Sequence, residues 1–280
     1  MSETESEQMR IAENLTASVL LKETVLALVG HPWQLLKAVF LPIWITALIF
    51  VGSGPLLESW GLSAGNWVAK VLVYSLVLIP LSSFVCSWHR ALLLGFDRPR
   101  TGFGLFFRMP ELLFSIKMVS LAIIGLLPLL AVGTLINAFS LNNGYGFLIL
   151  AQLVTALMWC RLFPLLPATA VSERRVGVIA ALRLTKKDQF ALWAVFIAFF
   201  LSSNAIGISI EWLREPALQW GTMLTYGLPF NGALWGAVKY DVRMMPTHLI
   251  FSAHLYLAAA LNASIMSVAY RELVTKKTAA

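Results

Sequence analysis

Long runs of apolar residues without charge dominate the chain. They cover residues 38–57, 71–88, 118–160, 190–210 and 244–270. Each run approaches or exceeds about 18 residues, the length typical of a membrane-spanning helix. A membrane β-barrel would instead alternate apolar and polar residues over segments of about 10 residues. Because lipid requires internal backbone hydrogen bonds, the pattern predicts an all-α membrane protein.

The run over residues 118–160 is too long for one span. It contains a cluster of turn-forming residues, Asn142, Asn143, Gly144 and Gly146, which predicts a helical hairpin. The expected spans are residues 35–51, 71–90, 112–136, 147–166, 190–210 and 249–270. The sequence therefore predicts six transmembrane helices, arranged as three hairpins.

A single transmembrane domain is expected over residues 14–272. Residues 1–13 form an acidic N-terminus that we expect to be disordered, and residues 273–280 form a basic cytoplasmic tail. Acidic residues stand where a cleavable signal peptide would carry positive charge, so the first span is expected to be retained. We interpret residues 216–246 as a non-cytoplasmic or re-entrant excursion, because glycine, proline and asparagine interrupt its apolar pattern. A seventh span is the alternative.

Composition agrees with a membrane protein. Hydrophobic residues make up 59% of the 280 residues and charged residues only 12%, whereas soluble domains contain about 25% charged residues. The formal net charge of +7 would suggest nucleic acid as the partner of a soluble protein. In a bilayer the same charges set orientation, so we expect no nucleic-acid partner.

Lysine and arginine are concentrated on one side of the predicted spans. Of the 21 basic residues, 15 fall on the side of the two termini: Arg10, Lys22, Lys37, Arg90, Arg98, Arg100, Arg108, Arg174, Arg175, Arg183, Lys186, Lys187, Arg271, Lys276 and Lys277. The other side carries Lys70, Arg214, Lys239 and Arg243. Because basic loops stay in the cytoplasm, both termini are predicted to be cytoplasmic.

The three helices that return to this side end alike, with a bulky residue followed by arginine. The arginines are Arg90, Arg161 and Arg271. Either a duplicated unit or the general preference for aromatic and basic residues at membrane boundaries explains the pattern.

Arg161 is the arginine that lies within a predicted span. We interpret it as a boundary anchor and not as a substrate-binding charge, because its counterparts lie at the boundary. Pro164 and Pro167 free the carbonyls of Cys160 and Phe163. These two carbonyls are the expected acceptors for its guanidinium group.

Two amphipathic segments are predicted on the cytoplasmic side. In residues 14–29, Leu21, Val25 and Leu28 share a stripe, with Lys22 and Glu23 turned away, as in helices that lie in the membrane interface. Residues 176–184 form the second segment. The candidate lipid-facing basic collar comprises Arg90, Arg161, Arg174, Arg175, Arg183, Lys186, Lys187 and Arg271. It predicts anionic lipids as partners, or serves only to set topology.

Within the spans, polar side chains are few. The candidate polar seam comprises Gln152, Asn204, His254 and Asn262. It either faces a solute or forms hydrogen bonds between helices. The three longest uncharged runs contain no carboxylate, which argues against proton-driven transport. Cys86 and Cys160 both lie inside apolar runs, so we interpret them as small buried hydrophobic residues and not as a disulfide or a metal pair. No catalytic, cofactor-binding or metal-binding motif is evident.

One part of the sequence resembles a known family. Residues 161–171, Gly177, residues 181–185, Phe190 and Trp193, together with residues 268–273, are similar to a pattern in bacterial six-helix membrane proteins. These include the membrane domain of some glycerophosphodiester phosphodiesterases. The resemblance implies the six-helix fold. It does not imply phosphodiesterase activity, because the sequence contains no catalytic domain like theirs.

These observations predict a multi-pass protein of a bacterial inner membrane that is not an enzyme and uses no cofactor. The expected function is that of a membrane-organising, assembly or lipid-interacting factor. The alternative is a small-solute channel or transporter that is not driven by an intramembrane carboxylate. The expected partners are the bilayer, including anionic lipids, and either another membrane protein or further copies of the chain.

Overall fold

The computed structural model describes residues 16–61, 67–96, 109–139, 144–172, 176–225 and 233–279. The predicted acidic N-terminus at residues 1–13 lies outside these ranges. Within them every regular element is a helix, which confirms the all-α class. The helices are α2 (Ala17–Val29), α3 (Pro32–Ser59), α4 (Trp67–Leu94), α5 (Met109–Phe139), α6 (Gly144–Leu162), α7 (Leu165–Ala170), α8 (Val178–Leu184), α9 (Gln189–Thr225) and α10 (Ala233–Ala279).

Every predicted span lies within, or largely within, a helix. In the described ranges, three helical segments are long and apolar enough to cross a membrane: Pro32–Gly54, Leu72–Leu94 and Arg243–Thr275. Two shorter apolar segments, Leu153–Leu162 and Gln189–Phe199, lie in α6 and α9. The structure therefore agrees with a membrane-embedded chain.

The fourth predicted span, residues 147–166, ends earlier than the sequence suggested. Helix α6 ends at Leu162, the chain turns at Phe163 and Pro164, and α7 follows as a separate helix. The physical reason is Pro164, which has no N–H to donate to the helix and whose ring would collide with the carbonyl four residues earlier. All six residues of α7 are buried.

The predicted excursion at residues 216–246 is helical wherever the structure describes it. Helix α9 continues through Pro216 to Thr225, and α10 already begins at Ala233. The two helices pack closely here, because a Cβ atom on Gly221 would lie 1.9 Å from the backbone oxygen of Arg243. Residues 273–279, interpreted from the sequence as a tail, continue α10.

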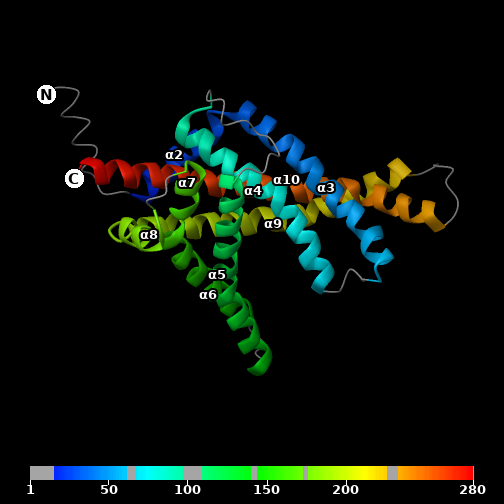
Figure 1. Ribbon diagram of the computed structural model, residues 1–280. Coiled ribbons are helices and arrows are strands. Elements are labelled where there is room, and N and C mark those ends of the chain that lie inside the picture. Colours follow the sequence, from blue (N-terminus) through cyan, green and yellow to red (C-terminus); the bar gives the residue numbers. More distant parts are fainter. Residues whose placement is uncertain are drawn as a thin grey trace.

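The three hairpins diverge from a common end of the molecule (Figure 1). They are α3–α4, α5–α6 and α9–α10. The short helices α2, α7 and α8 and the C-terminal end of α10 gather where the hairpins meet. We call this region the charged end, and define it by Arg90, Glu111, Arg161 and Arg271.

Large side chains form a buried core between the helices. Trp88, Phe114, Phe163 and Phe196 are all almost fully buried. The outer faces also carry large apolar side chains, including Phe40 on α3. Such exposed apolar surface is unusual in a soluble monomer, but it is what a lipid-facing surface requires.

Candidate functional site

Arg90 lies at the charged end, and its side chain is largely buried. Its guanidinium forms an ion pair with the carboxylate of Glu111, in the first turn of α5, and its Nε donates to the carbonyl oxygen of Ala170 at 2.6 Å. The two charged side chains are only 13% and 8% exposed. The sequence interpretation of Arg90 as lipid-facing is therefore wrong, because the buried helix α7 supplies an acceptor that turns this side chain inward.

Glu111 lies at the same end of the molecule, with its side chain buried within the bundle. A second cation lies nearby along the same helix: the Nζ of Lys117 donates to the hydroxyl oxygen of Thr169 on α7 at 2.7 Å. Helix α7 thus accepts hydrogen bonds from two cationic side chains on two different helices.

Arg161, at the end of α6, is held by three acceptors. Its Nε donates to the Thr185 hydroxyl oxygen at 3.1 Å, its Nη1 to Gln189 Oε1 at 2.7 Å, and its Nη2 to the Leu182 carbonyl at 2.8 Å. The carbonyls of Cys160 and Phe163, predicted from the sequence, are therefore not its acceptors. The reason is that α8 and the start of α9 fold back over the end of α6.

Arg271 has a different environment. It is 49% exposed, and its Nη2 lies 3.7 Å from Glu23 Oε2 on α2. The sequence turned Glu23 away from the apolar stripe of residues 14–29, and in the structure its carboxylate faces this arginine. A second carboxylate oxygen, on Glu272, lies 3.6 Å from the Arg271 Nε. These distances allow ionic attraction but exceed the usual hydrogen-bond range of about 2.7–3.2 Å.

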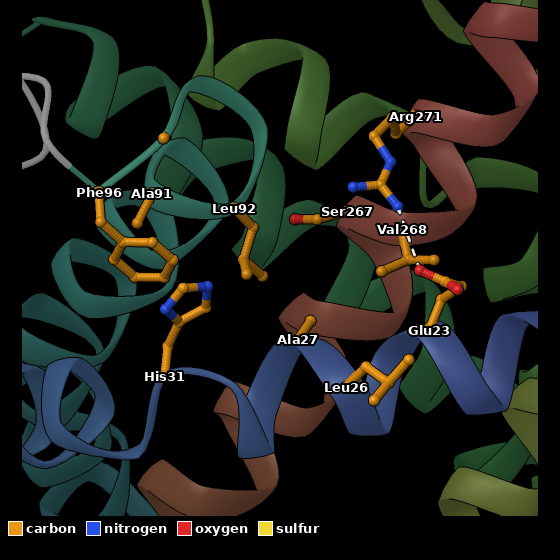
Figure 2. A pocket seen from close by; sticks show the side chains of 11 residues that line it. Glu23, Leu26, Ala27, His31, Ala91, Leu92, Phe96, Ser267, Val268 and Arg271 are labelled. Atoms are coloured by element: carbon orange, nitrogen blue, oxygen red, sulfur yellow. Dashed lines mark ion pairs between the residues drawn. The ribbon is translucent and has the colours of Figure 1, made fainter.

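A cavity of about 320 Å³ lies between α2, the end of α4 and the end of α10. We call it the α2–α10 pocket. It is lined by Glu23, Leu26, Ala27, His31, Ala91, Leu92, Gly95, Phe96, Ser267, Val268 and Arg271. Figure 2 shows His31 beneath Phe96 on one side of this space and the Glu23–Arg271 pair on the other. The ring centroids of His31 and Phe96 are 4.2 Å apart.

Two hydrogen bonds between α4 and α10 fix one wall of the pocket. Trp88 Nε1 donates to Ser264 Oγ at 2.9 Å, and His89 Nδ1 lies 2.7 Å from Ser267 Oγ. Consecutive residues of α4 thus bind serines three positions apart on α10, which share a helix face. The arrangement is a helix-to-helix clamp that also orients the Ser267 hydroxyl.

The candidate polar seam is described in part. His254 and Asn262 are both partly buried on α10, and the buried Asn262 Oδ1 has no hydrogen-bond partner among the described residues. The side chains of Gln152 and Asn204 lie outside what the structure describes. A different polar contact joins α10 to α3, where the hydroxyl groups of Thr46 and Tyr256 are 2.9 Å apart.

The remaining collar residues lie mainly around α8. Arg183, Lys186 and Lys187 are exposed, whereas Arg174 and Arg175 lie outside the described residues. Next to these cations, Val178, Ile179 and Leu182 of α8 are exposed apolar side chains. This second amphipathic segment therefore presents an apolar surface and positive charge together.

Helix α2 also exposes apolar side chains. It begins after the N-cap residue Thr16, close to the predicted start. Leu21 and Val25 of the predicted stripe are exposed, whereas Leu28 packs partly buried against the core, as do the buried Leu20 and Thr24. The part of the stripe at Leu21 and Val25 therefore faces outward, as an interfacial helix requires.

In the described part of the chain, no group of three or more histidine, cysteine or acidic side chains comes together to hold a metal ion. Cys86 and Cys160 are buried free thiols. Comparison of the chain with protein-family models, with curated proteins and with solved structures found no match. Functional inference therefore depends on the geometry of the charged end.

Sequence reasoning missed the Arg90–Glu111 pair and the α2–α10 pocket. A signal for the pair was present, because Glu111 directly follows Pro110 at the start of a predicted helix and is the acidic residue nearest to Arg90 after Asp97. No comparable signal marks the pocket. It forms from three segments that are far apart in the sequence.

Proposed function

We propose that the chain is a six-span inner-membrane protein of bacterial type, with both termini in the cytoplasm, that organises surrounding lipid without catalysis. Support comes from the charged end. Arg90, Arg161 and Arg271 close three different helices in the sequence, and the short helices gather where those ends meet. A common basic end is the arrangement expected when all three face the cytoplasm.

The observation that carries the lipid-interacting role is the surface of α8. Ile179 is 68% exposed and Val178 is 54% exposed, and the exposed cations Lys186 and Lys187 follow within three residues of the helix end. Apolar side chains inserted at the interface, with cations beside them, bind anionic lipid surfaces. Helix α8 and these lysines form the lipid-binding surface in this proposal.

A lipid-enrichment measurement tests this role. The full chain is reconstituted in phosphatidylcholine nanodiscs that contain phosphatidylglycerol, extracted in mild detergent, and analysed for retained lipid. The Lys186→Gln/Lys187→Gln variant is expected to lose phosphatidylglycerol enrichment by about fivefold for each cation, since each contributes about 1 kcal/mol near the surface. The control is Lys70→Gln/Arg243→Gln, which removes the same charge on the predicted far side. Equal losses in both variants would contradict the proposal.

Reporter fusions test the orientation. Fusions after Lys187 and Lys277 are expected to report cytoplasm, and fusions after Gly61 and Asn143 the opposite side, because of the uneven distribution of basic residues. A far-side result at Lys277 alone would indicate a seventh crossing in the region of α9 and α10.

A further inference from the structure

The Glu23–Arg271 pair holds two opposite charges apart at the edge of the α2–α10 pocket. The 3.7 Å separation of Arg271 Nη2 and Glu23 Oε2 leaves both groups able to form shorter hydrogen bonds with a ligand. Such a half-exposed pair contributes little to stability, so a ligand can insert between its members at small cost. The ligand that matches the pair carries one positive and one negative group.

The side chains that line the pocket indicate which charged groups the ligand carries. The planar guanidinium of Arg271 can donate to two phosphate oxygens at once, and Ser267, whose hydroxyl is held by His89, lines the pocket one helical turn before Arg271. The carboxylate of Glu23 suits an ammonium group that has N–H donors. His31, whose ring contacts Phe96, adds a further polar group to the pocket.

The size and surroundings of the pocket indicate a lipid source. A volume of about 320 Å³ is at the lower end of the range of about 300–1,000 Å³ for small-molecule sites, which suits a head group. Leu26 lines the pocket and is also 54% exposed, and the neighbouring Val25 and Val29 are exposed too. An acyl chain attached to the head group can therefore lie along α2.

We propose that the α2–α10 pocket binds the head group of a phospholipid with a primary ammonium, such as phosphatidylethanolamine. The phosphate contacts Arg271, and the ammonium donates to Glu23. This inference deepens the proposed function and rests on its lipid-interacting role. It assigns to α2 and α10 a selective site that is separate from the basic surface of α8, which binds anionic lipid in general.

Native mass spectrometry of the full chain measures the selectivity. The protein is titrated with phosphatidylethanolamine, phosphatidylcholine and phosphatidylglycerol of identical acyl chains. In the Lys186→Gln/Lys187→Gln background, which removes phosphatidylglycerol binding at α8, the first bound phosphatidylethanolamine is expected to have an affinity about tenfold above the other two, because phosphatidylcholine has no ammonium N–H and phosphatidylglycerol has no ammonium. Equal affinity for all three lipids would overturn the proposal.

Two variants separate the roles of the charged groups. Glu23→Gln is expected to abolish the preference for phosphatidylethanolamine over phosphatidylcholine while leaving phosphatidylcholine binding unchanged. Arg271→Gln is expected to weaken the binding of all three lipids, because each has a phosphate. The matched control is Glu272→Gln, which removes a carboxylate that is also near Arg271 but does not line the pocket. Loss of selectivity in Glu272→Gln equal to that in Glu23→Gln would contradict the assignment.

Further measurements define the source of the ligand and separate the two proposals. Soluble phosphoethanolamine is expected to compete only weakly, and competition as strong as that of the lipid would overturn the assignment to a lipid. The response of Lys186→Gln/Lys187→Gln to phosphatidylglycerol reports on the α8 surface alone. Loss of phosphatidylethanolamine selectivity in the Lys186→Gln/Lys187→Gln variant would overturn the separate site on α2 and α10.

Discussion

Arg90 and Arg271 occupy equivalent positions in the sequence but different environments in the structure. Each follows a bulky residue at the end of a predicted span that returns to the charged end. Arg90 is 13% exposed and paired with a buried carboxylate, whereas Arg271 is 49% exposed and 3.7 Å from its partner on α2. The same local pattern therefore produces a closed contact in one region and an open contact in the other.

The difference arises from α7. This buried helix lies against α4 and α5, and it supplies the Ala170 carbonyl to Arg90. At the end of α10 the neighbouring helix is α2, whose carboxylate stays at ion-pair distance. Breaking a buried ion pair such as Arg90–Glu111 costs several kcal/mol of folding free energy. A half-exposed pair such as Glu23–Arg271 remains available to ligands.

Neutralising Glu111 tests the closed region and has the largest expected effect. In Glu111→Gln the buried guanidinium of Arg90 loses its counter-charge but retains the Ala170 carbonyl. We expect a loss of about 3 kcal/mol in the free energy of unfolding, at the lower end of the range for a broken buried pair. Equilibrium unfolding in mixed detergent micelles measures it.

Glu23→Gln is the matched control for that measurement, because it makes the same chemical change in the open region. Its expected loss is within about 1 kcal/mol. Equal destabilisation by the two substitutions would show that the closed and open contacts do not differ energetically.

Arg161 lies between these extremes and is expected to give an intermediate effect. Its three nitrogen atoms donate to three separate acceptors on α8, α9 and the turn between them. Lysine presents a compact ammonium that does not reproduce this fork. Arg161→Lys is therefore expected to cost about 1–2 kcal/mol, measured by the same unfolding assay, and wild-type stability would show that one acceptor is sufficient.

The sequence predicted the helices better than it predicted their side-chain partners. Each predicted span coincides with a helix, wholly or largely. The reason is that a segment that crosses lipid must be apolar over its whole length and must satisfy its backbone hydrogen bonds internally. The end of α6 was misplaced by four residues, since the apolar pattern continues past Pro164 although the helix does not.

The environments of the arginines were not predictable from local pattern. Arg90, Arg161 and Arg271 share a local sequence pattern, yet their partners come from α5 and α7, from α8 and α9, and from α2 respectively. Those partners are fixed by how distant helices pack, which hydropathy does not encode. The pocket has the same origin, because its charged pair joins residues near opposite ends of the chain.

The smallest expected effect on stability comes from removing both members of the open pair. Glu23→Gln/Arg271→Gln keeps the polar character of the pocket and leaves no uncompensated charge between the two positions. Because half-exposed pairs contribute at most about 1 kcal/mol, the free energy of unfolding of this variant is expected to lie within about 0.5 kcal/mol of the wild-type value.

The analogous Arg90→Gln/Glu111→Gln variant sharpens the comparison. It also removes both charges, so it is expected to recover part of the stability lost in Glu111→Gln alone. A coupling energy near zero at the closed pair, or a large one at the open pair, would reverse the distinction between them. The unfolding measurements of the four single and two double variants form two double-mutant cycles. Each cycle gives the coupling energy of one ion pair, and the difference between the two coupling energies measures how much burial beside α7 changes the interaction of an arginine with its carboxylate.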